Sequence, residues 1–132
     1  MAKILIIDDS ASMLALLEQM LREEDYAVTI ASSGAEALEI LSQNPIDLVI
    51  TDIYMPALDG LEVMRLARAM KLNVPFIAIS SQVSPQNKFI PARGLGAQIS
   101  LQKPFAREQL IEAVEAVLAA SLESPFTQLQ RK

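Results

Sequence analysis

The sequence contains no cysteine and no histidine among its 132 residues. Without cysteine it can form neither a disulfide nor a thiolate nucleophile. Without histidine it can build neither a Ser-His-Asp triad nor a zinc site with nitrogen or sulfur ligands. Any metal site must therefore use oxygen ligands, which favour hard cations such as Mg²⁺.

Long hydrophobic runs and an excess of positive charge are also missing. No apolar run approaches the roughly 18 residues that a membrane-spanning helix needs. The 11 basic and 16 acidic residues give a net charge of −5, which disfavours direct binding of nucleic acid by the domain. The apolar stretch after Lys3 is too short for a secretory signal. We expect a soluble, cytoplasmic protein with no membrane insertion.

Five short apolar runs alternate with stretches in which apolar residues recur at helical spacing. The runs cover residues 4–7, 28–31, 48–50, 76–79 and 99–101. This (βα)5 pattern predicts an α/β fold with a doubly wound, parallel five-stranded sheet. We assign residues 1–120 to this domain and residues 121–132 to a polar tail or truncated linker.

The character of the runs predicts the strand order. Residues 4–7, 48–50 and 76–79 are continuously apolar, as strands covered on both faces are, whereas residues 28–30 and 98–102 alternate apolar with polar and suit edge strands. Right-handed crossovers then favour the flavodoxin-like order 2-1-3-4-5. In this order a crevice opens at the C-terminal ends of the first and third strands.

The fourth helix is the weakest element of the pattern. Residues 81–97 contain Pro91, Gly94 and Gly96. A proline inside a helix removes a backbone donor and clashes with the preceding turn. We therefore expect a short or broken helix in this segment.

Polar side chains stand at the ends of four of the five predicted strands. Asp8 and Asp9 follow the first strand, Asp52 the third, Ser80 ends the fourth and Lys103 follows the fifth. Because the first and third strands are neighbours, the three carboxylates converge on the crevice. Two carboxylates ~5 Å apart repel by roughly 3 kcal/mol at an effective dielectric of 20, so the cluster calls for Lys103 or a divalent cation.

Taken singly, each of these residues has a purely structural explanation. One of Asp8, Asp9 or Ser10 could cap the next helix, and Asp52 could begin a turn. The hydroxyl of Ser80 could cap or stabilise a turn as well. The joint pattern at one edge of the sheet is what favours a functional site.

At this point residues 3–120 resemble the receiver domain of bacterial two-component response regulators. The resemblance rests on LIIDDS at residues 5–10, DLVITDIYMPALDG at 47–60, PFIAIS at 75–80 and KPF at 103–105. It implies a phosphoryl-accepting switch or relay that catalyses only its own phosphorylation and dephosphorylation, and so is not an enzyme acting on a separate substrate.

The resemblance implies a role for each acid in the crevice. Asp52 matches the phosphorylated aspartate, Asp9 the direct Mg²⁺ ligand and Asp8 the acid that holds the hydration shell of the ion. The backbone carbonyl of Tyr54 matches a further metal ligand. We expect Mg²⁺ as the cofactor, with Mn²⁺ as a possible substitute.

The resemblance also implies roles around the phosphoryl group. Ser80 and Lys103 match the hydroxyl and the ammonium that bind it and report its presence. Tyr54 and Gln82 stand at positions that tune the lifetime of the phosphorylated state. Ser100 replaces the aromatic ring that usually follows the hydroxyl, so the output surface is expected to work differently.

The implied partners are a sensor histidine kinase or a histidine phosphotransfer protein, since the chain has no histidine of its own to donate a phosphoryl group. A downstream protein target is implied but not identified. Two alternatives stay open: an interaction module on the same fold that works without phosphorylation, and a haloacid-dehalogenase-like phosphatase. The phosphatase family wants a second Asp two residues after the first-strand nucleophile, where this chain has Ser10.

Overall fold

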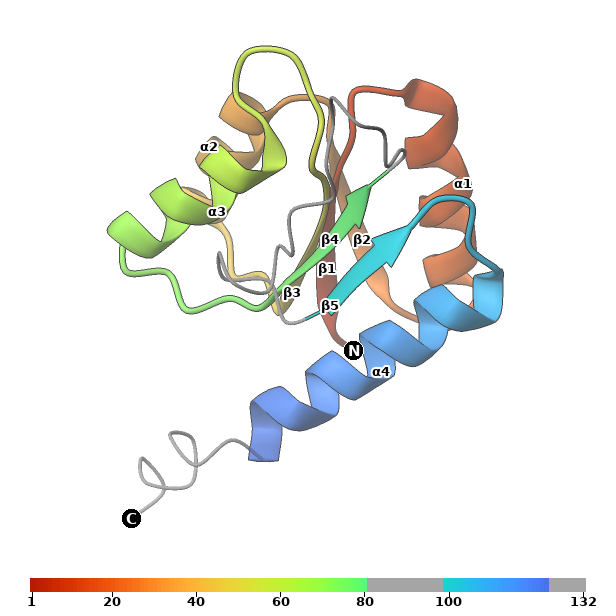
Figure 1. The fold of residues 1–132 in the computed structure, drawn as a ribbon. Helices are drawn as coiled ribbons and strands as arrows, with labels where there is room; N and C mark the ends of the chain where they lie inside the picture. The colour runs from red at the N-terminus through yellow and green to blue at the C-terminus, as the bar shows by residue number, and fades with distance from the viewer. Residues whose placement is uncertain (81–98, 124–132) are drawn as a thin grey trace.

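The computed structural model describes residues 1–80 and 99–123, which form a single parallel sheet flanked by helices (Figure 1). The sheet has the order β2-β1-β3-β4-β5, as predicted. Its strands are β1 (Lys3–Ile7), β2 (Ala27–Ala31), β3 (Leu48–Asp52), β4 (Phe76–Ser80) and β5 (Ile99–Gln102). The helices described are α1 (Ala11–Arg22), α2 (Gly34–Gln43), α3 (Gly60–Ala69) and α4 (Arg107–Glu123).

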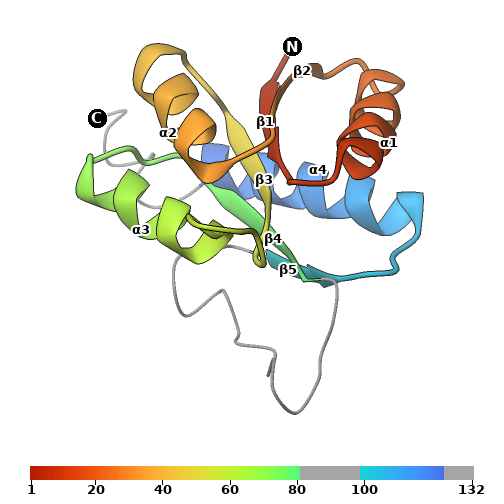
Figure 2. The same cartoon turned by 90° about the horizontal axis from the view of Figure 1, so that it is seen from above.

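The helices cover both faces of the sheet and produce two hydrophobic cores. Figure 2 shows α2 and α3 on one side of the sheet and α1 and α4 on the other. Alternate residues of each strand enter alternate cores, so Ile4 and Ile6 pack with α1 and α4, whereas Leu5 and Ile7 pack with α2 and α3. This two-residue period decides on which face each functional side chain lies.

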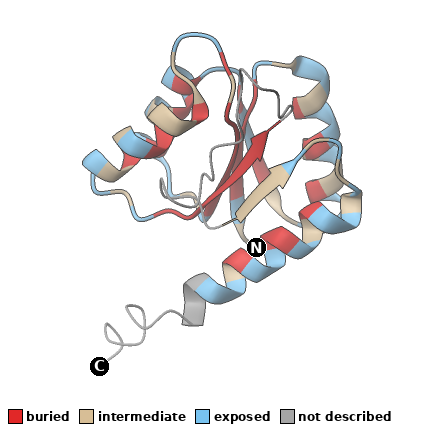
Figure 3. Ribbon diagram, in the orientation of Figure 1, coloured by how far each residue is buried: buried red, intermediate tan, exposed pale blue. Residues whose placement is uncertain are grey.

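The strand character read from the sequence follows from this coverage. β3 and β4 are buried along their whole length, and Figure 3 shows both in the colour of buried residues. β5 is the outermost strand on one side of the sheet and is only half-buried. β2 departs from simple alternation because Thr29 and Ile30 are both exposed, Ile30 to 41%. At this edge α1 covers Val28 but leaves Ile30 open to solvent.

Helices α1, α2 and α3 each have a side-chain cap at the first turn. Ser10 accepts a hydrogen bond from the Met13 amide at the start of α1, and Asp59 accepts one from the Glu62 amide at the start of α3. Ser10 therefore performs the capping that was the structural alternative for Asp8 and Asp9.

Several sequence predictions lie outside the described residues. They include the broken fourth helix within residues 81–97 and the position of Gln82. The boundary predicted at residue 120 falls within α4, which ends at Glu123, two residues before Pro125. The division into a domain and a tail stays a prediction. None of the described helices combines the length and apolar composition that a bilayer-spanning segment requires.

Candidate functional site

Strand periodicity brings acidic and basic side chains to one corner of the sheet. Ile6, Ile50 and Leu101 all pack in the core beneath α1 and α4. Asp8, Asp52 and Lys103 each follow one of these residues by two positions in the direction of the same strand. Each polar residue thus continues an apolar column of its own strand at the carboxyl edge, where the column ends.

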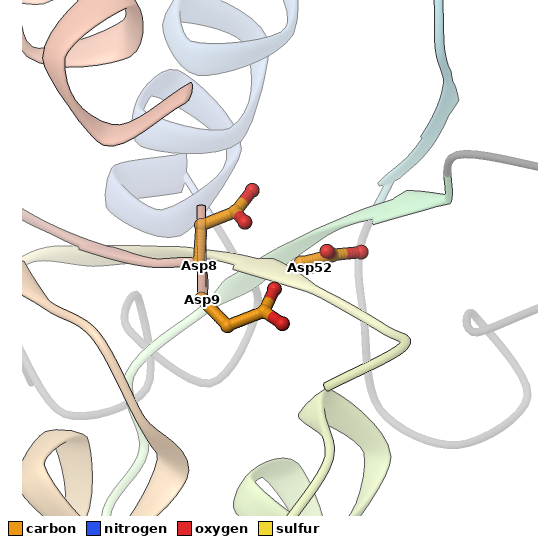
Figure 4. Close-up of side chains that lie close together, drawn as sticks. All are labelled: Asp8, Asp9 and Asp52. Atoms are coloured by element: carbon orange, nitrogen blue, oxygen red, sulfur yellow. The ribbon is translucent and has the colours of Figure 1, made fainter. Parts of the chain in front are cut away.

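The three acids predicted to converge do so. Asp8, Asp9 and Asp52 each offer a carboxylate oxygen within 4.8 Å of the others. Figure 4 shows their side chains coming together from the end of β1 and the end of β3. Asp8 and Asp52 are 1% and 5% exposed, whereas Asp9 is exposed to solvent. The cluster therefore has two buried carboxylates and one that faces water.

Lys103 supplies the positive charge that this cluster requires. Its Nζ lies 3.3 Å from Oδ2 of Asp8 and 3.9 Å from Oδ2 of Asp52, and its side chain is 16% exposed. The Lys103 amide donates a 2.7 Å hydrogen bond to the Ser80 carbonyl, which fixes the base of the side chain against β4. The peptide bond from Lys103 to Pro104 is cis.

Asp52 is the titratable group that this environment perturbs most clearly. The pKa of Asp52 is raised from its ordinary 3.8 to about 6; burial is the largest cause, and the negative charges of Asp8 and Asp9 act in the same direction. Lys103 and the Tyr54 amide lower the pKa against that trend. The carboxylate is therefore mostly ionised at neutral pH, although its environment disfavours the charge.

The loop after β3 is packed tightly against Asp52. The Tyr54 amide donates to Oδ1 of Asp52 at 3.3 Å, and the Gly60 amide donates to the Ile53 carbonyl at 3.0 Å. A Cβ on Gly60 would stand only 2.2 Å from the Asp52 carbonyl oxygen, so this position requires glycine. Ala57 in the same loop has a φ of 62°, which is uncommon for a residue with a side chain.

Ser80 and Ser100 belong to the opposite face of the sheet. Ala78 packs in the core with α2 and α3, so alternation places Ser80 on that side of β4, and Ala78 is the register partner of Ser100. Ser80 is fully buried. The Ser100 hydroxyl is also buried, and it has no hydrogen-bond partner among the described residues. Gln82 lies outside them.

A shallow apolar groove adjoins the acidic cluster. It has a volume of about 380 Å³ and is lined by Met13, Leu16, Met20, Lys103, Pro104 and Phe105. Leu16 on α1 is 46% exposed and contributes to this apolar lining. Lys103 lines the groove and contacts the acids, so the two features are continuous.

Sequence reasoning assigned no role to two residues that hold Asp52 in place. Gly60 was part of the quoted motif, but its contact with the Asp52 carbonyl needs the fold to be seen. Thr51, fully buried in β3, donates its hydroxyl to the same carbonyl at 3.0 Å. A polar residue at the end of an otherwise apolar buried strand was the available signal.

The sequence profile of the response regulator receiver domain matches residues 4–115. The chain belongs to the response regulator receiver family. It is a phosphoryl-accepting receiver of two-component signalling, and receiver domains are generally not enzymes in the ordinary sense. The family and the fold predicted from the sequence are thus confirmed.

The relatives show how much of a longer protein this receiver represents. The chain is 37% identical to the transcriptional regulatory protein PrrA of Mycobacterium tuberculosis over 116 residues. This match covers 88% of this chain and 49% of PrrA. The chain is 34% identical over 119 residues to the transcriptional regulatory protein PhoP of Bacillus subtilis, covering 90% and 49%. The chain therefore spans about half the length of these curated relatives.

A solved receiver domain from Clostridium thermocellum has the same architecture. Its crystal structure superposes with a TM-score of 0.83 at 32% identity, covering 92% of this chain and 97% of that one. The agreement extends over nearly the whole of both chains, so the two share the receiver fold.

Proposed function

We propose that this receiver is phosphorylated on its own Asp52. The observation that carries the proposal is the meeting of three carboxylates within 4.8 Å of one another beside the Lys103 ammonium. Of the three, Asp52 lies on the central strand β3 and has both Lys103 and the Tyr54 amide near its carboxylate oxygens. These donors steady an ionised carboxylate in one orientation, as an in-line nucleophile requires.

The donor set fits a hard divalent cation. All the available ligand atoms are carboxylate oxygens, and their mutual distances suit a single small ion. Asp9, Asp52 and the Tyr54 carbonyl would hold Mg²⁺, or Mn²⁺, with Asp8 holding water in its shell. When bound, the ion neutralises charge on the equatorial oxygens of the phosphoryl group.

The chain's own residues account for the rest of the reaction. A carboxylate oxygen of Asp52 forms a bond to phosphorus while the bond from phosphorus to the donor nitrogen or oxygen breaks, and the electron pair leaves with the donor. The Lys103 ammonium, which is paired with Asp8, is proposed to exchange this partner for an oxygen of the transferred group. Ser80 is the last residue of β4, so although it belongs to the other face, its hydroxyl stands at the same carboxyl end of the sheet and is proposed to donate to another of those oxygens.

Asp52→Asn tests the proposal. With acetyl phosphate and Mg²⁺, we expect intact-protein mass spectrometry to show a phosphoryl adduct on wild type and none on Asp52→Asn. Asp25→Asn is the matched control, because Asp25 is exposed and its φ of 66° suits asparagine. Lys103→Ala should slow labelling, and EDTA should stop it. Labelling of Asp52→Asn at the wild-type level would show that another residue is the acceptor.

We further propose that the phosphodonor is a sensor histidine kinase or a histidine phosphotransfer protein that docks in the groove beside Lys103. The groove is apolar, continuous with the acidic cluster and bordered by the exposed Leu16. Leu16→Asp should therefore slow transfer from a kinase that phosphorylates wild type, yet leave labelling by acetyl phosphate unchanged. Met70→Asp, at a similarly exposed apolar position on α3's end, is the control.

Tyr54 is proposed to lengthen the life of the phosphorylated state by shielding phosphorus from water. Its backbone N–H holds Asp52, so truncating the side chain leaves that hydrogen bond in place. We expect faster phosphate loss from Tyr54→Ala than from wild type in a radiolabel chase. Equal loss would remove the shielding role and leave Asp52 as the acceptor.

The cytoplasmic location and the lack of nucleic-acid binding by this domain stay predictions. The sequence also allowed an interaction module that works without phosphorylation, which the family assignment disfavours. It would be favoured if wild-type protein took up no label from acetyl phosphate or from any histidine kinase.

A further inference from the structure

The main-chain carbonyl of Asp52 has an unusual environment for the last residue of a strand. The Thr51 hydroxyl donates a hydrogen bond to it at 3.0 Å. Gly60 lies against the same oxygen, so closely that a Cβ there would stand 2.2 Å from it and 3.0 Å from the Thr51 hydroxyl. Thr51 and the first residue of α3 therefore enclose the carbonyl between them.

Thr51 is a polar residue at a position where packing alone asks for an apolar one. It is fully buried, and its register partners on either side are Ile7 and Ala78, both members of the core beneath α2 and α3. Valine has nearly the same shape and would fill this space without burying a hydroxyl. The hydroxyl therefore needs an explanation beyond packing, and its hydrogen bond to the Asp52 carbonyl offers one.

We propose that Thr51 is a positioning residue for phosphoryl transfer, acting through the Asp52 carbonyl; the inference rests on Asp52 being the acceptor. The hydrogen bond fixes the peptide plane between Asp52 and Ile53. That plane sets the direction in which the chain leaves Asp52 and hence where the Tyr54 amide meets Oδ1. A small rotation of the peptide would tilt the carboxylate away from the line of attack, to which such reactions are sensitive.

The test compares variants that separate the hydroxyl from the shape of the side chain. Thr51→Val keeps the shape and loses the hydroxyl, whereas Thr51→Ser keeps the hydroxyl. Thr29→Val is the matched control, since Thr29 is exposed on the edge strand β2. The rate of phosphorylation by acetyl phosphate at saturating Mg²⁺ and the rate of phosphate loss are both measured well below the unfolding temperature.

We expect Thr51→Val to lower both rates by about tenfold, because both reactions use the same line of attack at phosphorus. Thr51→Ser should stay within about twofold of wild type, and Thr29→Val should match wild type. A purely structural role would lower the unfolding temperature of Thr51→Val but leave the rates of the folded protein unchanged. That result, or a Thr51→Ser variant as slow as Thr51→Val, overturns the inference.

Two further comparisons keep the result interpretable. If Thr51→Val does not fold, Thr51→Ala and Thr51→Ser replace it, since both lose the methyl group and only one loses the hydroxyl. Asp52→Asn is measured alongside. Wild-type labelling of Asp52→Asn overturns the proposed acceptor, whereas an inert Asp52→Asn beside a fast Thr51→Val overturns only the role of Thr51.

Discussion

Charged side chains lie at both edges of the sheet, but their partners differ. At the amino edge, Asp47 accepts a 2.8 Å hydrogen bond from the Lys3 amide. Arg68 donates to the carbonyls of Leu72 and Val74 at 3.2 and 3.1 Å there. At the carboxyl edge, Asp52 instead lies among other carboxylates, and its pKa rises to about 6, chiefly through burial.

The difference shows that the charges at the amino edge stabilise the fold, whereas the fold holds the charges at the carboxyl edge together. Charges at the amino edge satisfy backbone groups of the loops and stabilise them. The acids at the carboxyl edge repel each other and are kept together by the strands and by the packing of the loop after β3. Substitutions at the amino edge should therefore change stability, whereas those at the carboxyl edge should change reactivity, sometimes with a gain in stability.

The largest effect is expected for Gly60→Ala. The added methyl group would stand 2.2 Å from the Asp52 carbonyl oxygen, so the loop must move away from β3. We expect a loss of about 3 kcal/mol in the free energy of unfolding, and phosphorylation of the folded fraction should slow by at least about tenfold. Urea denaturation and acetyl phosphate labelling measure the two effects.

Gly34→Ala is the control for this substitution. Its added methyl group would meet the Leu58 carbonyl at 2.6 Å, which is backbone of the same loop but not of Asp52. It should destabilise the protein with a smaller effect on labelling. Equal slowing in both variants would mean that the contact with Asp52 is not the sensitive one.

Arg68→Ala should give the largest loss of stability at the amino edge. The variant loses two hydrogen bonds from a charged donor and a contact with the Phe76 ring, whose centroid lies 5.8 Å from the guanidinium. We expect a loss of about 2 kcal/mol, with labelling of the folded protein unchanged. Arg65→Ala, which removes only a fully exposed pair with Glu62, should cost far less stability than Arg68→Ala. Slower labelling of folded Arg68→Ala would break the contrast between the two edges.

Asp52→Asn should stabilise the metal-free protein in a manner that depends on pH. The native pKa of Asp52 is raised to about 6 from 3.8, so the unfolded chain ionises first as the pH rises, and wild type loses stability between about pH 4 and 6. The asparagine variant avoids this loss. At pH 8 in EDTA we expect it to be about 2 kcal/mol more stable than wild type, and at pH 3.5 nearly equal. A difference that is the same at both pH values would contradict the assignment of the raised pKa.

Lys71→Gly should produce the smallest change. Lys71 is exposed after α3 and has a φ of 64°, which costs a residue with a side chain more than it costs glycine. The gain is partly offset by the greater freedom of glycine in the unfolded chain, so we expect about 0.5 kcal/mol of added stability. Labelling should not change. Thermal unfolding with and without the substitution is sufficient to measure it.

The strands and their order were predictable from sequence because burial on both faces leaves a continuous apolar run. The same reasoning placed Asp8, Asp52 and Lys103 at one edge, since it needs only strand direction and order. It did not foresee that Thr29 and Ile30 would both be exposed, because coverage of an edge strand depends on how far one helix extends over it. The sequence of β2 alone does not indicate how far the neighbouring helix extends over it.

The supporting contacts of the site were less predictable. Thr51 donates to a carbonyl of its neighbour, and Gly60 approaches that carbonyl from eight residues further along the chain. Such contacts depend on distances of a few tenths of an ångström, which no residue pattern encodes. The burial of the Ser100 hydroxyl without a hydrogen-bond partner among the described residues was equally unpredictable, since the sequence showed only that the usual ring is absent.

The alternation that assigns Asp52 and Thr51 to opposite faces also limits how this domain can change in evolution. Deleting or inserting one residue within β3 would exchange the two positions, sending the acceptor into the core beneath α2 and α3. The acids of the site can therefore tolerate changes in neighbouring side chains, but not changes in strand length. Length variation among related receivers should accumulate outside the strands, where an inserted or deleted residue does not move side chains to the other face of the sheet.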